Sequence, residues 1–574
     1  MPLRAPRRVP NCWIIFRDAV ILRNPRDASN RREHQVNQAR AELTQMPSSN
    51  PLKYVLAIDM GSGSTKAAVV SSAGEVVASA LRHTTTMMME GGAVEQDPEQ
   101  WWRSVCDAAK EAIAASRVPA AQIIAVVCTT LWAVTVAVDK DGAAIGNAIS
   151  WMDTRGAKYN RAVAAGWPRV QGYGLFKLLK WLRFTGGAPV QSGVDGLGHI
   201  LFFKNERPEV YARTFKFLEP MDYLNLRLTG QFAASYATMF TYWLTDNRNP
   251  NRIDYLPELL AMAGVDRAKL PDLRPVNAVL GAIKPEVAAG LGLAPSTCVV
   301  MGSCDGHSAT LGAGAVDNYE GYFYIGTTAW LSCHVPAKKT DPLHMLSAMP
   351  AALPGRYMVS AEQGAAGRSL DFLKDILYPT DSANSPIDVY GDMNRLAAAV
   401  APGSDGLIFT PWINGVLAPH EDASTRSAFF NQNARTSRGH YVRAVMEGVA
   451  YNLRWLKGHV EKFIGRPFEH LNFIGGGASS DLWCQIQADV LGCTVRQVAN
   501  PRNANAVGAA MAAFAALGEI AVEEISARVK IAAEYRPIEI NRRLYDRQFR
   551  EFLEFYKRNR AIYRRLNSAA RASD

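Results

Sequence analysis

Two aspartates follow apolar runs and stand beside glycines, a setting in which a carboxylate can do chemistry. Asp59 follows the run 54–58, and Asp305 follows the run 298–301 within the sequence Gly-Ser-Cys-Asp-Gly. A carboxylate at the end of a buried strand can accept a proton from a substrate hydroxyl, or hold Mg²⁺ through water. The alternative for each residue is an aspartate that only caps a turn. Both are therefore candidates for an acid–base or magnesium site.

A loop rich in glycine and hydroxyl side chains follows Asp59. Gly61 and Gly63 permit positive φ and close backbone approach, so amide hydrogens can point at phosphate oxygens. The loop joins two strands, and it matches neither GxxxxGK[ST] nor GxGxxG. We predict a phosphate-binding loop, with a plain hairpin as the alternative. Its further predicted contacts are Ser62, Ser64, Thr65 and the cation Lys66, for which an exposed lysine is the alternative.

Two more glycine-containing loops follow apolar runs in the second half of the chain. The run 322–325 leads into a Gly-Thr-Thr loop, and the run 471–474 leads into a glycine triplet before a helix predicted over 481–491. Residues 503–518 predict a small-residue helix with a nucleotide role, or with packing alone as the alternative. The predicted nucleotide contacts in the two loops are Gly326, Thr327, Thr328, Gly476, Gly477 and Ser480.

The elements that must position these loops alternate between strands and helices. Residues 53–80 predict three strands joined by turns, and residues 99–116 predict an amphipathic helix. A buried strand over 123–128 follows, and the alternation continues to residue 228, which indicates α/β organisation. Loops of the same kind begin again near residue 298. We therefore expect two related domains that face each other across a cleft.

Length and composition are those of a globular protein of more than one domain. The chain has 574 residues, 48% hydrophobic and 20% charged, and no apolar run approaches the ~20 residues of a membrane span. The net charge of +10 lies mainly near the two ends, without a basic stripe among aromatics, so no nucleic-acid partner is expected. The eight cysteines are scattered and no secretory signal is evident, which favours a reduced, cytoplasmic protein without membrane contact.

Residues 1–52 differ from the rest of the chain. They are rich in Arg and Asn and lack sustained periodicity, so we expect a poorly ordered basic extension outside the fold. An annotated start placed too early, with Met46 as the true start, is one interpretation. An Arg-rich targeting peptide is the other, although four acidic residues oppose it.

Taken in order, these segments resemble the FGGY carbohydrate kinases of the actin-like ATPase superfamily. The resemblance runs from about residue 53 to about residue 560. Any one of its motifs is weakly specific, whereas seven in the family's order are strongly so. They are the first phosphate loop at 59–66, Gln-Asp-Pro within 93–98, Trp-x-Asp-x-Arg at 151–155, the Asp-Tyr-Leu run at 222–230, Gly-Ser-Cys-Asp at 302–305, the second phosphate loop at 324–328 and the adenosine loop at 475–480.

This resemblance implies a fold and a reaction. The fold is α/β, with two actin-like (ribonuclease H-like) domains facing across a central nucleotide and substrate cleft. The N-terminal domain, 53–297, would carry the first phosphate loop, and the C-terminal domain, 298–574, would carry Asp305 and a basic last helix. The reaction is transfer of the ATP γ-phosphoryl group to a hydroxyl of a small-molecule sugar or polyol, with ATP and Mg²⁺ as cofactors. Asp305 would be the catalytic base and, with Asp59, a metal ligand, and a homodimer is the assembly that the family suggests.

The chain departs from the family where the family contacts its substrate. Residues 131–134 read Leu-Trp-Ala-Val, whereas xylulose kinases have Gln-Met-His-Gly and glycerol kinases have Gln-Arg-Glu. A signature segment that favours Lys and Trp also has His199 and Phe202 instead. Overall similarity still favours a ketopentose such as xylulose, with other pentuloses, gluconate and tetritols open and glycerol disfavoured. The predicted substrate contacts are Trp132, Ala133, Asp153 and Asp305.

Several alternatives accompany this interpretation. Trp132 could be core packing, and Asp153 could pair with Arg155 instead of a sugar. Cys304 and His307 are interpreted as a packed thiol and a hydrogen-bonded imidazole, not as a nucleophile pair. For the whole protein, the alternatives are a superfamily ATPase without a sugar substrate and a catalytically silent nucleotide-binding regulator.

Overall fold

The computed structural model describes residues 52–378 and 388–567. The extension predicted over 1–52 therefore lies outside the described residues, apart from Leu52. None of the helices within the described ranges is both long enough and apolar enough to cross a membrane.

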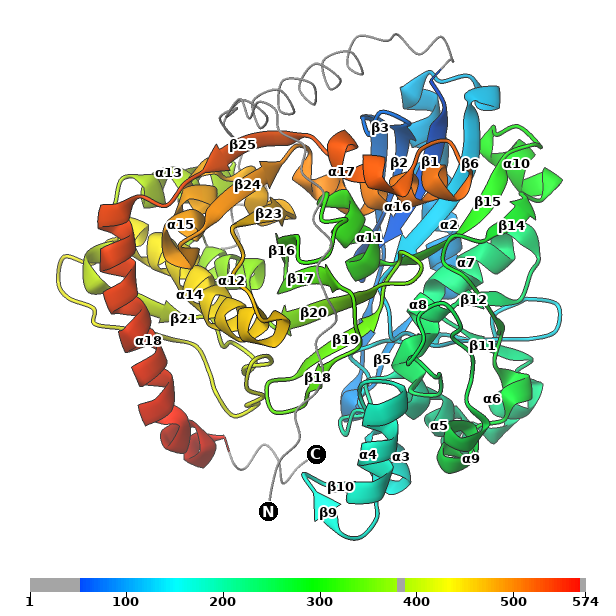
Figure 1. The fold of residues 1–574 in the computed structure, drawn as a ribbon, viewed down its shortest axis with the longest axis horizontal. Coiled ribbons are helices and arrows are strands. Elements are labelled where there is room, and N and C mark those ends of the chain that lie inside the picture. Colours follow the sequence, from blue (N-terminus) through cyan, green and yellow to red (C-terminus); the bar gives the residue numbers. More distant parts are fainter. Residues whose placement is uncertain (1–51, 379–387, 568–574) are drawn as a thin grey trace, which may run out of the picture. The chain divides into compact units, whose positions relative to one another are not determined.

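The first of two large sheets combines antiparallel and parallel pairing (Figure 1). In spatial order its strands are β3 (Val76–His83), β2 (Ser64–Ser71), β1 (Tyr54–Met60), β6 (Ile123–Thr130), β15 (Cys298–Cys304) and β14 (Val279–Ala282). Strands β1 to β3 form the predicted antiparallel meander, while β1 runs parallel to β6 and β6 parallel to β15. The carboxyl ends of β1, β6 and β15 consequently lie at one edge of this sheet.

The second sheet repeats this design. In spatial order its strands are β18 (Thr340–Asp341), β19 (Leu346–Pro350), β20 (Tyr357–Gln363), β17 (Ala329–Val335), β16 (Gly321–Ile325), β23 (His470–Ile474), β24 (Thr494–Val498) and β25 (Ile531–Tyr535). The run β20-β17-β16-β23-β24 has the same strand directions as β3-β2-β1-β6-β15. The predicted pair of related domains is thus present as a duplicated topology.

The predicted boundary between residues 297 and 298 is wrong. Strand β15 begins at Cys298 and pairs with β6, so it completes the first sheet instead of opening the second. The second sheet begins with β16 at Gly321, which is the topological counterpart of β1. Asp305 therefore belongs to the first domain, because it directly follows β15.

Helix α2 (Pro98–Ser116) shows how sequence sets local structure in the first domain. Pro98 occupies its first turn, and the Asp97 side chain caps it by accepting from the Glu99 amide. Its buried side chains recur with helical spacing and pack in one core with β1, β2 and β6. The predicted helix over 99–116 is therefore confirmed. The other helices of this part are α3 (Ala157–Ala164), α4 (Leu175–Phe184), α5 (Gly196–Glu206), α6 (Pro208–Arg213), α7 (Pro220–Thr229), α8 (Tyr236–Met239), α9 (Pro257–Ala263), α10 (Pro285–Leu291) and α11 (Asp305–Gly312).

Long helices pack with the second sheet in its core. Residues of α14, α15 and α18 share that core with β16, β17 and β23 (Figure 1). The helices of this part are α12 (Gly367–Leu377), α13 (Val389–Ala398), α14 (Arg438–Ile464), α15 (Asp481–Leu491), α16 (Ala504–Ala516), α17 (Ile525–Arg528) and α18 (Glu539–Leu566). Short strands complete the fold as β4 (Met87–Met88), β5 (Val94–Gln96), β7 (Val136–Val138), β8 (Ala148–Ile149), β9 (Arg169–Val170), β10 (Tyr173–Gly174), β11 (Lys216–Leu218), β12 (Ala233–Ser235), β13 (Asp272–Arg274), β21 (Ile408–Thr410) and β22 (Ala428–Phe430).

The small-residue helix α16 packs directly against α11. A Cβ atom added to Gly508 would lie 1.9 Å from the Ser308 carbonyl oxygen, and one added to Gly312 would lie 1.8 Å from the Ala504 carbonyl oxygen. Only glycine permits this approach. Helix α16 also contacts β1, β6 and β15. It therefore supports both the strands and the helix whose ends carry the two aspartates.

Candidate active site

The two predicted aspartates lie at the same sheet edge, on either side of β6. Asp59 pairs in register with Thr129 of β6, and Thr129 pairs with Ser303 of β15, two residues before Asp305. Neighbouring strands are about 4.8 Å apart, so the backbones that carry the two carboxyl groups are separated by roughly 10 Å. The carboxyl end of β6 lies between them and leads into the segment Leu131–Val134.

Asp59 is a partly buried carboxyl group with a nearby cation. Its side chain is 15% exposed, and Lys66 Nζ lies 3.9 Å from its Oδ2 atom. Burial raises the pKa of Asp59, while Lys66 and the Asn505 side chain lower it again. Lys66 also donates a hydrogen bond to the Arg502 carbonyl. The structure thus places Lys66 beside Asp59, and not as a freely exposed lysine.

Asp305 begins α11 and accepts a hydrogen bond from the Gly306 amide at 2.7 Å. Burial raises the pKa of Asp305 to about 7, and the carboxylates of Asp59 and Glu362 contribute to the rise. Such a carboxyl group can exchange a proton near neutral pH, as a general base must. The carboxyl groups of Asp59 and Glu362 both act on Asp305, the Lys66 ammonium lies beside Asp59, and oxygen ligands suit Mg²⁺. The donor set therefore fits a magnesium ion.

The first glycine loop is a tight turn whose backbone is held from several sides. The Gly61 amide donates to the Ser64 carbonyl at 2.9 Å, and the Ser62 carbonyl accepts from Gln96 Nε2 at 2.8 Å. Trp151 Nε1 donates to Ser62 Oγ at 3.1 Å, which ties the Trp-x-Asp-x-Arg segment to this loop. These contacts fix the loop before any ligand binds.

The sequence argument about this loop needs two corrections. Neither Gly61 nor Gly63 adopts positive φ, and the glycines instead leave room, since a Cβ atom on Gly63 would meet nothing within 4 Å. Thr65 is fully buried, and its hydroxyl is hydrogen bonded to Ser104 of α2 at 2.9 Å. The Thr65 side chain therefore faces the core and does not point toward a phosphate.

The two loops of the second domain share one edge because β16 and β23 are adjacent and parallel. The Gly326 amide donates to the Thr328 carbonyl at 2.9 Å, and the Thr327 carbonyl accepts from the Ala366 amide at 3.0 Å. Tyr324 precedes this loop, and its pKa is raised by burial and also by Asp59 and Asp305. The loop is therefore near both aspartates of the first domain.

The glycine triplet has distinct roles at its three positions. Gly475 adopts φ +89°, and a Cβ atom there would lie 2.5 Å from the Ile325 carbonyl oxygen. A Cβ on Gly477 would meet Ile325 at 2.8 Å, whereas one on Gly476 would meet nothing within 4 Å. Gly475 and Gly477 thus pack against β16, and Gly476 is open to a ligand. Ser480 caps α15 by accepting from the Trp483 amide at 3.1 Å.

The predicted substrate segment forms an aromatic wall near Asp305. The half-buried Trp132 ring lies 4.9 Å from the Phe240 ring, which lies 6.2 Å from the His307 ring. Ala133 has φ +56°, an uncommon value for a residue other than glycine. Next to it, the Val134 amide donates to the buried carboxylate of Glu219 at 3.1 Å. An unusual backbone bend therefore presents the Trp132 ring.

Asp153 is held inside an ionic network. Its carboxylate is fully buried and accepts from the Val94 amide at 2.8 Å and from Arg155 Nη2 at 2.7 Å. Arg155 Nη2 also donates to Glu95 at 2.7 Å, and Arg207 donates to Glu95 at 2.8 Å. The sequence left open whether Asp153 pairs with Arg155 or binds a sugar, and the structure shows the pairing with Arg155. The Asp153 carboxylate is therefore already hydrogen bonded within the protein.

Cys304 and His307 are packed groups beside the candidate base. Cys304 Sγ lies 2.8 Å from His307 Nδ1, and His307 Nε2 lies 2.7 Å from the Pro350 carbonyl. Burial raises the pKa of the Cys304 thiol and lowers that of His307 to about 4. A neutral thiol and a neutral imidazole agree with the structural interpretation of this pair.

Several residues near the site, Glu362 among them, were not predicted individually from the sequence. Asn505 acts on Asp59, Tyr324 lies close to both aspartates, and Glu219 supports the backbone of the Trp132 segment. The polar Asn-Ala-Asn start of an otherwise apolar helix was a signal for Asn505. A carboxylate directly before Pro220, at the start of the Asp-Tyr-Leu helix, was a signal for Glu219.

Comparisons with known proteins agree with this geometry. Models of the N-terminal and C-terminal domains of the FGGY family of carbohydrate kinases match residues 54–312 and 321–517. A xylulose kinase of Bacillus subtilis is 27% identical over 90% of this chain and 99% of its own length, and a gluconokinase of the same species is 25% identical over 86% and 93%. A ligand-bound xylulose kinase structure from Lactobacillus acidophilus has a TM-score of 0.77 at 22% identity, covering 90% of this chain and all of that one.

The duplicated sheets and the matching structures define a protein of two actin-like domains around a cleft. The chain belongs to the FGGY family of carbohydrate kinases. It is therefore a sugar kinase that uses ATP and Mg²⁺, as the resemblance implied. The relatives act on different substrates by name, so the family leaves the particular sugar open.

Proposed function

We propose that this kinase phosphorylates a hydroxyl of a ketopentose such as xylulose, with Asp305 as the base. The observation that carries the proposal is the placement of Asp59 and Asp305 on either side of β6, with the Trp132 segment following that strand. Three requirements of phosphoryl transfer, namely a base, a metal ligand and a surface for the acceptor, then belong to three neighbouring strand ends.

The proposed chemistry assigns one task to each group. Asp305 accepts the proton of the acceptor hydroxyl while that oxygen forms its bond to the γ-phosphorus and the bond to the leaving ADP oxygen breaks. Lys66 offsets negative charge beside Asp59. Mg²⁺, held by Asp59 and Asp305, would supply charge neutralisation of the phosphate oxygens. Open backbone at Gly63 and Gly476 would hold the phosphates and the nucleoside side of ATP.

The charge balance near the first loop favours a neutral sugar. Trp151 joins the Trp-x-Asp-x-Arg segment to this loop, and the Arg155 guanidinium in that segment is already paired with Asp153 and Glu95. A gluconate carboxylate would need a cation that is not already neutralised. The apolar C–H face of a ketose instead suits the Trp132 ring. This contrast supports a ketopentose over gluconate.

A coupled assay of ADP release tests the proposal. The panel contains D-xylulose, other pentuloses, gluconate, tetritols and glycerol, each with ATP and Mg²⁺. We expect turnover with a ketopentose, and a loss of about 10²–10⁴-fold in kcat for Asp305→Asn with retained ATP binding. Asp141→Asn, on an exposed loop, is the matched control and should keep full activity.

Other results of this assay would favour one of the alternative functions. ATP hydrolysis that is equal with and without every sugar would indicate a superfamily ATPase, and ATP binding without turnover would indicate a silent regulator. Preference for gluconate would refute the ketopentose. The homodimer that the family suggests is part of the proposal, and light scattering that gives a monomer mass would refute it.

A further inference from the structure

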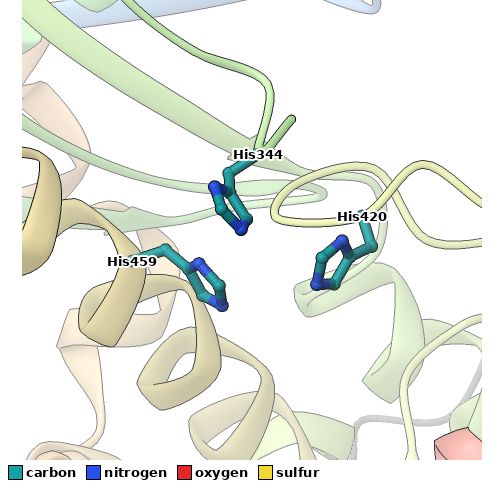
Figure 2. Close-up of side chains that lie close together, drawn as sticks. All are labelled: His344, His420 and His459. Atoms are coloured by element: carbon teal, nitrogen blue, oxygen red, sulfur yellow. The ribbon is translucent and has the colours of Figure 1, made fainter. Parts of the chain in front are cut away.

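Three histidines far apart in the sequence meet at one point of the second domain. His344 lies in the turn between β18 and β19, His420 lies in the loop before β22, and His459 lies on α14. One ring nitrogen from each lies within 4.8 Å of the corresponding atoms of the other two. Figure 2 shows the three rings turned toward a shared space.

The ring nitrogens have few partners other than one another. His344 Nδ1 is bonded to Asp341 Oδ2 at 2.7 Å, which leaves its Nε2 atom available. Within residues 52–378 and 388–567, neither His420 nor His459 makes a hydrogen bond through its ring. All three side chains are half-buried, so water reaches them only in part. Two imidazoles without a hydrogen-bond partner in these ranges, beside a third that has one free ring nitrogen, are unusual for a cluster that only packs.

We propose that His344, His420 and His459 form a binding site for Zn²⁺. Imidazole nitrogen is a preferred ligand of zinc and a poor one of Mg²⁺, so this site would be chemically separate from Asp59 and Asp305. Three protein ligands leave the fourth tetrahedral position to water. The contact between Asp341 and His344 is the carboxylate–histidine arrangement that orients a zinc-bound imidazole.

The geometry requires only a small adjustment. Zinc–nitrogen bonds of about 2.0–2.1 Å in a tetrahedron place the ligand atoms about 3.4 Å apart. The present spread of up to 4.8 Å closes with ring rotations that move each nitrogen by roughly 1 Å.

Nearby charges would act on the bound ion in both directions. Arg560 and Lys462 lie near the cluster and would repel a cation. Arg560 is itself 3.5 Å from the Asp422 carboxylate, and Asp341 contributes a second negative charge. The Asp422 carboxylate therefore offsets the positive charge of Arg560 that a zinc ion would otherwise meet.

A bound ion would fix the β18–β19 hairpin to α14. The other side of this hairpin region contacts the first domain, where Lys338 Nζ donates to the Leu182 carbonyl at 2.9 Å and Ser347 Oγ donates to the Gly186 carbonyl at 2.9 Å. Zinc would thus stabilise the hairpin that contacts the first domain. Its role would be structural and not catalytic.

Zinc titration of the untagged, chelator-treated protein tests the site. We expect one Zn²⁺ per chain by calorimetry, a rise in Tm with zinc, and for Co²⁺ the visible absorption of a tetrahedral nitrogen site. His459→Gln and His344→Gln should each weaken zinc binding at least 100-fold, and Asp341→Asn by about 10–100-fold. His83→Gln changes an exposed histidine elsewhere and should bind zinc as the wild type does.

The outcomes separate this proposal from the aspartate site and from misfolding. Asp305→Asn should still bind one Zn²⁺, because the histidines are untouched. Unchanged Tm values of the histidine variants without zinc would show that they are folded. Absence of stoichiometric binding, or equal binding by His459→Gln, His344→Gln and the wild type, would overturn the proposal.

Discussion

Asp59, near the end of β1, and Asp305, directly after β15, lie on either side of β6, and burial together with the Asp59 carboxylate raises the pKa of Asp305. The two side chains are therefore coupled by charge although the chain between them spans most of the first domain. Burial, with a smaller contribution from this coupling, raises the pKa of Asp305 to about 7, so the candidate base is close to its protonation midpoint at neutral pH.

The pH dependence of the reaction should report the raised pKa of Asp305. A base works only in its deprotonated form, and the pKa of Asp305 is about 7. We expect kcat/KM to be constant above that value and to fall about tenfold per pH unit below it. The measurement is kcat/KM for the best sugar from pH 5 to pH 9 at saturating ATP and Mg²⁺. If the residual kcat/KM of Asp305→Asn falls at acidic pH in the same way, the titrating group is not Asp305.

Removal of the aromatic wall should affect the sugar and not the nucleotide. Trp132 lies against Phe240, and loss of one aromatic contact is worth about 0.5–1.5 kcal/mol. We expect Trp132→Ala to raise KM for the sugar roughly 2–10-fold while KM for ATP stays unchanged. Trp132→Phe should retain most of the affinity, and Phe176→Ala, at a side chain 70% exposed, should be silent. A change in KM for ATP alone would place Trp132 outside the sugar site.

Substitution of Asp153 distinguishes a structural ion pair from a sugar contact. Asp153→Asn leaves the largely buried Arg155 with Glu95 alone, and loss of a buried partner costs about 3 kcal/mol. Thermal unfolding should show this loss while KM for the sugar changes little. Asp246→Asn breaks a surface pair with Arg248 and should cost less than about 1 kcal/mol. An unchanged Tm with a tenfold higher KM would instead make Asp153 a substrate ligand.

The contact between α11 and α16 should be sensitive to a single methyl group. Gly508→Ala would place Cβ 1.9 Å from the Ser308 carbonyl oxygen, so the helices must separate at a cost of about 1–3 kcal/mol. Because α11 begins at Asp305, kcat should fall together with Tm. Gly290→Ala, in α10, meets nothing within 4 Å and is the matched control. Equal Tm and kcat for the two variants would contradict this account.

The sequence indicates the parts of the fold that depend on local signals. The helix at 481–491 carries its own cap in Ser480 and was predicted with the bounds that α15 has. Asp59 and Asp305 were found because strand ends and glycines mark them. The membership of β15 in the first sheet was missed, because that pairing with β6 joins segments far apart in the chain. The backbone support by Glu219 and the meeting of the three histidines likewise depend on tertiary contacts that no local pattern records.

The duplicated topology has an electrical consequence. β16 occupies the place of β1, yet it is followed by Gly326 and Thr327 where β1 carries Asp59, and β24, the counterpart of β15, leads to Asn500 where β15 leads to Asp305. The first copy thus carries carboxylates at these two strand ends, and the second carries uncharged residues at the equivalent positions. Two domains of the same topology therefore form a cleft whose two sides differ in charge at these positions. If Asp59 and Asp305 hold the metal as proposed, we expect a bound triphosphate to have its metal-bearing end toward the first copy and its base toward the glycine loops of the second.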